Sequence, residues 1–133
     1  MPKDGIESKD SAADGRAQRL AAEASLRTCQ MEVERGDDQT TLALAGEFDA
    51  SCVLRYERLF REATEDSMSN LVVDMREVTF IDSTGLALLL RTEAASRQDG
   101  FELRILRSPA ATVQSALEAS GLERLLPFVD ELD

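Results

Sequence analysis

Three small polar residues, Asp82, Ser83 and Thr84, stand side by side directly before Gly85 and Leu86. Strand-forming residues precede them and a helix-period run follows, so the hydroxyls fall where a buried strand ends and a helix begins. Unpaired backbone N–H groups and the helix dipole favour a phosphate at such a position. The same residue types are the preferred helix N-caps, so capping is the alternative interpretation. One residue suffices for a cap, and three in a row favour a functional role.

The rest of the chain offers little catalytic chemistry. It contains no histidine and two cysteines, Cys29 and Cys52. Without histidine, Ser-His-Asp and Cys-His nucleophiles are excluded, and a zinc site would lack ligands. The sequence has neither a Walker-type phosphate loop nor a dinucleotide-binding glycine motif. Both cysteines fall on apolar faces, which predicts core thiols; we expect a protein that is not an enzyme and holds no metal or cofactor.

The length, composition and net charge of the chain limit its fold and the partners that it can bind. The 133 residues suit one domain, and a hydrophobic content of 43% argues against global disorder. The net charge of −11, from 26 acidic and 15 basic residues, would repel nucleic acids and anionic membranes. A protein with a basic patch is the expected partner, and plain solubility is the simpler explanation of the charge. With no membrane-length apolar run and no signal region, we expect a cytoplasmic protein.

Two regions are predicted along the chain. Residues 1–25 are expected to form a flexible or partly helical tail, because residues 1–15 are polar and residues 17–26 are rich in helix formers. Residues 26–133 are expected to form the folded domain. Within it, alternating or continuous apolar runs predict strands at residues 29–34, 40–45, 71–75, 101–106 and 128–129.

Helix-period segments separate these strands. The first helix is expected to be capped by Asp49 or Ser51 and to bury one side of residues 53–63. The second should bury a stripe of Leu86, Leu89, Leu90 and Ala94 and end at Gly100. The third is expected to open at Ser108-Pro109 and to end at Gly121. The order β-β-α-β-α-β-α-β predicts an α/β fold with a mixed, mostly parallel sheet of four to five strands and about three core helices.

Three motifs resemble the STAS domain family, named after sulfate transporters and anti-sigma factor antagonists. Ile81-Asp82-Ser83-Thr84-Gly85-Leu86 resembles the family signature. Gly46-Glu47-Phe48-Asp49 resembles an earlier Gly-Glu-Leu-Asp turn, with Phe in place of Leu. Residues 116–122 resemble the third helix and the turn beyond it. The three motifs occur in order at compatible spacing, and the resemblance extends over residues 26–132.

The resemblance implies a bacterial anti-sigma factor antagonist that regulates transcription by partner switching. Such a protein binds a kinase-type anti-sigma factor, which thereby releases its sigma factor. The kinase uses ATP to phosphorylate a serine of the antagonist, and a phosphatase reverses the modification. The family's serine corresponds to Ser83. Thr84 is the secondary candidate and is expected to serve as the helix cap instead.

The expected partner surface combines both strand-end motifs. The carboxyl ends of parallel strands share one edge of a sheet, so we expect the partner to contact Glu47, Phe48, Asp49, Asp82, Ser83, Thr84, Gly85 and Leu86. Other interpretations are a non-switching STAS scaffold in a sensory or transport complex and a receiver-like domain phosphorylated on Asp74 or Asp82. The receiver chemistry needs a late lysine, whereas the only lysines are Lys3 and Lys9. The sequence leaves open whether the protein is a monomer or a weak dimer.

Overall fold

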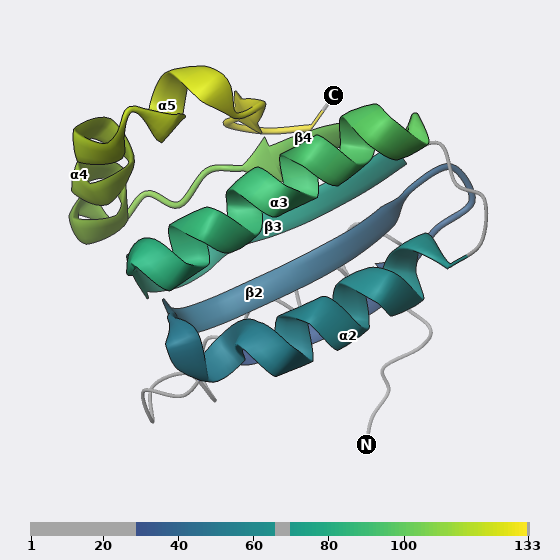
Figure 1. The fold of residues 1–133 in the computed structure, drawn as a ribbon, viewed down its shortest axis with the longest axis horizontal. Helices are drawn as coiled ribbons and strands as arrows, with labels where there is room; N and C mark the ends of the chain where they lie inside the picture. Colours follow the sequence, from purple (N-terminus) through teal and green to yellow (C-terminus); the bar gives the residue numbers. More distant parts are fainter. Residues whose placement is uncertain (1–28, 66–69, 133) are drawn as a thin grey trace.

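Residues 29–65 and 70–132 are described by the structure, a computed structural model. They form a five-stranded sheet in the order β1-β2-β3-β4-β5 (Figure 1). The strands are β1 (Gln30–Arg35), β2 (Thr40–Phe48), β3 (Asn70–Ile81), β4 (Glu102–Leu106) and β5 (Phe128–Val129). The helices are η1 (Ala50–Cys52), α2 (Val53–Thr64), α3 (Ser83–Asp99), α4 (Ala111–Ser120) and α5 (Leu122–Leu125). The expected tail, residues 1–25, lies outside the described residues.

The sheet is mixed, as the element order predicts. β1 and β2 pair antiparallel through a tight turn in which the Gly36 N–H donates to the Gln39 carbonyl at 2.7 Å. The pairs β2–β3, β3–β4 and β4–β5 are all parallel. Each parallel pair is connected through a helix, which is the arrangement that parallel strands require. The predicted α/β class and the predicted succession of strands and helices along the chain are confirmed.

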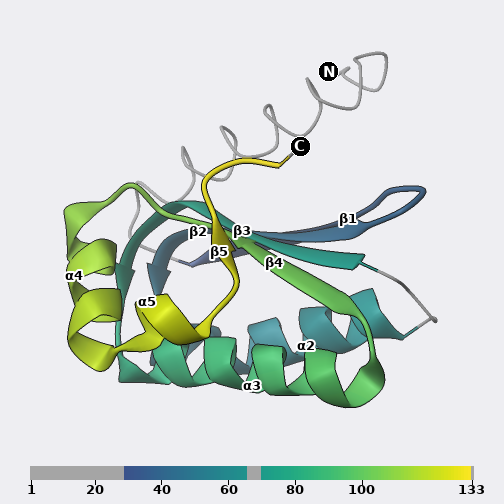
Figure 2. The ribbon, with the colours of Figure 1, turned by 90° about the horizontal axis from the view of Figure 1, so that it is seen from above.

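Both long helices, α2 and α3, lie on one face of the sheet (Figure 2). Between this face and the helices lies the main hydrophobic core. Alternate strand residues point into it because side chains of a strand alternate between faces. The fully buried strand residues of this core are Leu42, Leu44, Phe48, Leu71, Val73, Met75, Val78 and Ile105. The helices α4 and α5 lie toward one end of the sheet (Figure 1).

The buried stripe of α3 differs from the prediction. Gly85, Leu88, Leu89, Thr92 and Ser96 are buried, whereas Leu90 is 41% exposed and Ala94 is also exposed. The stripe therefore starts at the small Gly85 and includes two hydroxyl residues. A prediction that uses only large apolar side chains misses this stripe, because its first residue is Gly85, which has no side chain.

Strand β3 is longer than the predicted residues 71–75 and continues to Ile81. Only the first half of β3 lies between two neighbouring strands, because β4 pairs with residues 70–74 alone. Beyond Asp74 the strand pairs only with β2, and two register irregularities occur there, at Ala43/Ala45 and at Gly46/Glu47. The second half of β3 carries the partly exposed Arg76 and Glu77. These charged residues interrupt the apolar run that predicts a strand in the sequence.

The third predicted helix begins later than expected. Ser108 does not cap it: α4 starts at Ala111, and its N-cap residue, Ala110, makes no side-chain cap. The Ser108 hydroxyl is fully buried and donates to the Val78 carbonyl at 2.7 Å, while it accepts from the Ala110 N–H at 3.1 Å. Ser108 therefore ties the turn before α4 to β3.

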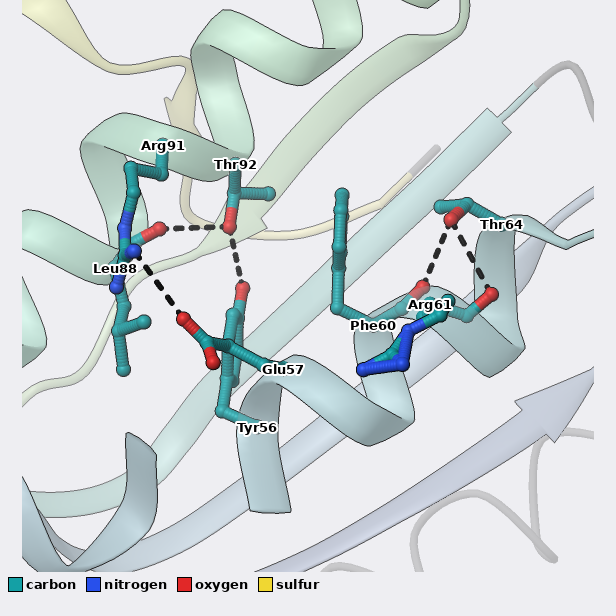
Figure 3. Close-up of a pocket in the computed structure, with 8 residues that line it drawn as sticks. All are labelled: Tyr56, Glu57, Phe60, Arg61, Thr64, Leu88, Arg91 and Thr92. Atoms are coloured by element: carbon teal, nitrogen blue, oxygen red, sulfur yellow. Dashed lines mark hydrogen bonds and ion pairs between the residues drawn. The ribbon is translucent and has the colours of Figure 1, made fainter. Parts of the chain in front are cut away.

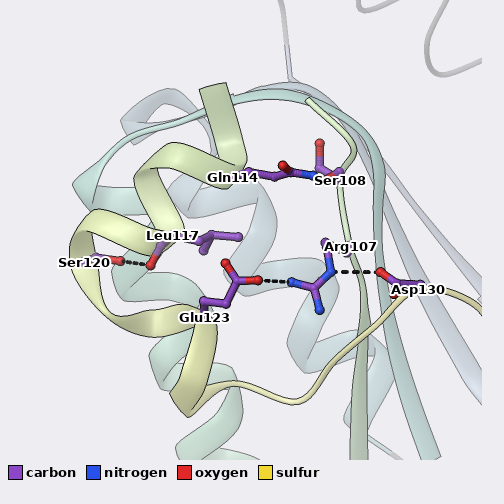
Figure 4. A network of polar contacts seen from close by, with 7 residues as sticks. All are labelled: Arg107, Ser108, Gln114, Leu117, Ser120, Glu123 and Asp130. Atoms are coloured by element: carbon purple, nitrogen blue, oxygen red, sulfur yellow. Dashed lines mark hydrogen bonds and ion pairs between the residues drawn. The ribbon is translucent and has the colours of Figure 1, made fainter. Parts of the chain in front are cut away.

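Arg107 connects the last elements of the chain with the sheet (Figure 4). Its guanidinium contacts the carboxylates of Glu123, in α5, and Asp130, which follows β5. It also lies over the ring of Phe128, 5.2 Å from the ring centroid, in cation–π geometry. One side chain thus joins β4, α5 and β5.

Tyr56 joins the two long helices (Figure 3). Its hydroxyl lies 2.6 Å from the Thr92 hydroxyl, which donates to the Leu88 carbonyl at 2.8 Å. Because a threonine hydroxyl has one proton, Tyr56 is the donor to Thr92. A groove of about 360 Å³ lies over this pair, and an ion pair of 3.2 Å between Glu57 and Arg91 spans its rim.

Titration of Tyr56 is expected to report the integrity of this helix contact. Burial raises the pKa of Tyr56 to about 12, against about 10 in an unfolded chain. The folded state therefore keeps a proton that the unfolded state loses, so this contribution to stability is complete below pH ~10 and is lost between pH ~10 and ~12. Since Tyr56 is the only tyrosine, tyrosinate absorbance of native and urea-unfolded protein measures it directly. Equal pKa values in the two states would contradict the burial of Tyr56 between the two helices.

Candidate functional site

The two sequence motifs meet where β2 and β3 end. Phe48 pairs with Ile81 as the last residue of each strand, so Asp49 and Asp82 follow at the same edge of the sheet. The Asp82 N–H donates to the Phe48 carbonyl at 3.4 Å and links the two turns directly. The structure thus brings together the turn at residues 47–49 and the segment at residues 82–86.

Asp82 is the residue that caps α3. Its backbone is extended, and its carboxylate accepts from the Gly85 N–H at 3.0 Å. The expectation that Thr84 caps the helix is wrong, because Thr84 is already its second residue. Ser83 is the first residue of α3 and is exposed. The cap thus leaves the Ser83 hydroxyl available beside the helix N-terminus.

Removal of the Asp82 carboxylate is expected to cost more stability than removal of the Ser83 hydroxyl. Asp82→Ala should lower the free energy of unfolding by about 1 kcal/mol, since it removes the capping bond. Ser83→Ala should change it by less than about 0.5 kcal/mol, because Ser83 is exposed and does not cap the helix. Urea unfolding of both variants measures the difference. A larger loss of stability for Ser83→Ala than for Asp82→Ala would show that Ser83 caps the helix.

The neighbouring turn is held by Asp49. Its carboxylate accepts from both the N–H and the hydroxyl of Ser51, at 3.0 and 2.6 Å. Asp49 is therefore the N-cap of η1, one of the two candidates that the sequence left open. The buried thiol of Cys52 donates to the Glu47 carbonyl at 3.3 Å and fastens the turn from inside.

Gly85 allows α3 to approach β2 closely. A Cβ atom at this position would overlap the Phe48 carbonyl oxygen and would lie 2.7 Å from Ile81 Cγ1. Such an approach is possible only for a residue without a side chain. Gly85 therefore sets the distance between the first turn of α3 and the turn at Asp49.

Two exposed apolar residues at this edge are missing from the sequence-based site. Phe80, 42% exposed, pairs with Glu47 across β2 and β3, and Leu54, 82% exposed, lies in the first turn of α2. No sequence signal marks Phe80 as exposed, because Val78, Phe80 and Ile81 read as one apolar run in which only Thr79 is polar. Conversely, Phe48 and Gly85 are buried, so their part in the predicted surface is to position the exposed residues.

Among residues 29–65 and 70–132, three or more metal-ligating side chains do not cluster anywhere. Cys29 and Cys52 are buried, as expected of core thiols. The neighbouring Cys52 thiol and burial raise the pKa of Cys29, whereas the neighbouring Cys29 thiol lowers the pKa of Cys52. Within these ranges, none of the helices could span a bilayer.

Comparison with known proteins identifies the family. The family model described as "Mlab, STAS domain" matches residues 31–127. An anti-sigma-B factor antagonist of Staphylococcus aureus (strain NCTC 8325 / PS 47) is 28% identical over 96 residues, which cover 72% of this chain and 88% of that protein.

Solved structures agree with this match. The crystal structure of an anti-sigma factor antagonist from Mycobacterium paratuberculosis superposes with a TM-score of 0.69 at 25% identity, over 80% of this chain and 90% of the other. The anti-sigma factor antagonist SpoIIAA in its unphosphorylated form shares the fold, with a TM-score of 0.65 at 20% identity over 78% and 90% of the two chains. The chain therefore belongs to the STAS domain family.

Proposed function

We propose that this protein is an anti-sigma factor antagonist that binds a kinase-type anti-sigma factor and is switched off by phosphorylation of Ser83. Ser83 carries the proposal, because it is an exposed hydroxyl at the first position of a helix whose cap is made by its neighbour, Asp82. The relatives named as antagonists support the role. On this proposal the protein is a cytoplasmic regulator that acts by binding, and it needs no catalytic residue of its own.

Phosphorylation at Ser83 is compatible with the fold. A phosphoryl group adds about −1.5 to −2 charges. The N-terminus of α3 favours an anion by roughly 0.3–1 kcal/mol, and an exposed position leaves room for it. A partner docked on the same edge would meet this charge at its interface, where desolvation and like-charge repulsion cost several kcal/mol. The switch would therefore act on the complex and leave the antagonist folded.

The proposed docking surface is the edge formed by the ends of β2 and β3. Its exposed or half-buried members are Glu47, Asp49, Asp82, Ser83, Thr84 and Leu86, and Phe80 extends it. Glu47, Asp49 and Asp82 give this surface negative charge, which favours a partner with a basic patch. Phe80 and Leu86 supply the apolar area that such an interface needs at its centre.

Phosphorylation of an aspartate is less compatible with the geometry. The Asp74 carboxylate is buried and held by three bonds from Arg76, from the backbone N–H, Nε and Nη2, at 2.9–3.1 Å. Asp82 is occupied by the cap of α3. The non-switching scaffold shares the fold, so the experiments below are designed to separate it from the switch.

Phosphosite mapping tests the switch. The purified protein is incubated with ATP and each ATP-binding anti-sigma factor encoded in the same genome, and the products are mapped by mass spectrometry. We expect a single modification at Ser83, which a phosphatase of the same system removes. Modification of Thr84 with Ser83 untouched would overturn the assignment, and the absence of any modification would favour the scaffold.

Amide hydrogen exchange of the complex tests the docking surface. We expect new protection in residues 47–54 and 80–87 when the anti-sigma factor binds. The turn at residues 36–39 and the end of α3 at Gly100 serve as the internal control, because they lie at the opposite ends of β2 and α3 from the proposed surface. Protection confined to α4 and the C-terminus would place the interface elsewhere.

A further inference from the structure

The groove between α2 and α3, over the bond from Tyr56 to Thr92, has no part in the proposed switch (Figure 3). Its lining residues include none of residues 47–49 and 82–86, so it is separate from the proposed docking surface. Its volume of about 360 Å³ is that of a small-molecule site.

The floor of the groove is apolar and fixed. Tyr56, Leu88 and Thr92 are each 2% exposed, and Phe60 is half-buried beside them. The rings of Tyr56 and Phe60 are parallel within 7°, with centroids 6.2 Å apart. The Tyr56 hydroxyl donates to Thr92, whose own hydroxyl donates to the Leu88 carbonyl. Because these protons are already used, a molecule that contacts the floor meets aromatic and aliphatic surface.

The rim of the groove is positively charged. Its charged residues are two arginines, Arg61 and Arg91, and one glutamate, Glu57, which leaves one positive charge in a chain of net charge −11. The Arg91 guanidinium lies 3.2 Å from the Glu57 carboxylate, which compensates it. The Arg61 side chain is exposed and forms no ion pair with any residue that the structure describes. Arg61 therefore holds the uncompensated charge.

A hollow of similar volume beside Arg107 lacks this feature. It is also lined by an arginine and measures about 360 Å³. The Arg107 guanidinium, however, already contacts the carboxylates of Glu123 and Asp130. An uncompensated guanidinium beside apolar surface thus distinguishes the groove between α2 and α3 from that hollow.

We propose that this groove binds a small organic acid, a carboxylate carried on an apolar body. The body packs on Phe60 and Leu88, and the carboxylate accepts from the guanidinium of Arg61. An arginine and a carboxylate pair through two parallel charge-assisted hydrogen bonds, which fixes the orientation of the acid. The bond between Tyr56 and Thr92 holds the floor in place before the acid binds, which lowers the entropy cost of binding.

Binding of 4-phenylbutyrate to the full-length protein tests the site. Tm should rise with its concentration, because an acid bound only to the folded state stabilises that state. The fluorescence of Tyr56, the only tyrosine and part of the floor, should change with the same midpoint. The alcohol 4-phenylbutanol has the same body without the charge and should bind at least about tenfold more weakly. Acetate, which has the charge without the body, should not bind over the same concentrations.

Arg61→Gln tests the position of the carboxylate. It should weaken binding of 4-phenylbutyrate about tenfold and leave binding of 4-phenylbutanol unchanged, whereas Arg61→Lys, which keeps the charge, should retain most of the affinity. Arg58→Gln is the matched control, because Arg58 is exposed on the same helix and does not line the groove. Without ligand, Tm of Arg61→Gln should equal that of the unmodified protein, since Arg61 forms no ion pair that the change could break.

Three outcomes would overturn the proposal. The first is the absence of any response of Tm and Tyr56 fluorescence to 4-phenylbutyrate. The second is equal affinity for 4-phenylbutyrate and 4-phenylbutanol, and the third is equal affinity of Arg61→Gln and Arg58→Gln for the acid. None of these measurements involves Ser83 or the anti-sigma factor, so their failure would leave the proposed switch untouched.

Discussion

Ser83→Asp is expected to weaken binding of the anti-sigma factor by at least about tenfold while the antagonist stays folded. The substitution places one negative charge on an exposed residue at the edge that carries Glu47, Asp49 and Asp82. Like-charge contact in an interface costs several kcal/mol, and about 1.4 kcal/mol is a factor of ten in affinity. The helix N-terminus favours the new carboxylate, so Tm should not fall. Calorimetric titration with the partner and a thermal melt together measure the two effects.

Ser83→Ala is the matched control for that variant. It removes the hydroxyl without adding charge, so it should bind like the unmodified protein, resist the kinase and leave the sigma factor permanently released. If Ser83→Asp binds as tightly as both other proteins at equal Tm, charge at this position does not control the interface. The non-switching scaffold would then be the better description of this STAS domain.

Gly85→Ala is expected to lower the free energy of unfolding by about 3 kcal/mol, at the upper end of the cost of overpacking. In an ordinary helix the same change stabilises by roughly 1 kcal/mol, so the expected sign is reversed here. The reason is the overlap of the new Cβ with the Phe48 carbonyl oxygen and Ile81 Cγ1, which forces the first turn of α3 away from β2. Urea unfolding measures the loss, and binding of the anti-sigma factor should weaken too, because Ser83 moves relative to Asp49.

Gly100→Ala separates this steric effect from a general intolerance of glycine replacement. Gly100 ends the same helix with φ of +82°, and a Cβ there would meet no atom within 4 Å. Its loss of stability should be about 1–2 kcal/mol, from left-handed strain alone, and partner binding should be unchanged. A Gly85→Ala variant as stable as the unmodified protein would show that the contact between α3 and β2 is looser than described.

The arrangement of elements was predictable from the sequence because each one carries a local signal. Alternation at Met31 and Val33, the glycine stops at Gly100 and Gly121, and the apolar run at residues 71–75 each have a direct physical cause. The predictions were wrong where tertiary contacts override such signals. Leu90 is exposed because α3 packs on the sheet through the side that carries Gly85, Leu89 and Thr92.

The site was predictable in position and less so in detail. Parallel strands must end at one edge, so the meeting of Asp49 and Asp82 followed from topology. The identity of the cap did not follow, since Asp82, Ser83 and Thr84 all qualify and only the helix start decides among them. Phe80 could not be found by strand pattern, because the register of β2 and β3 shifts just before it.

The contacts of Arg107 affect how easily β5 leaves the sheet. The last strand is two residues long and pairs only Ile105 with Phe128 and Leu106 with Val129. The ion pairs and the ring contact of one arginine therefore add to the two backbone bonds that attach it to β4. Salt screens exposed charges, so rising ionic strength loosens this strand before the rest of the core. Once it leaves, β4 becomes an open edge with unpaired backbone groups, able to accept a strand from another chain.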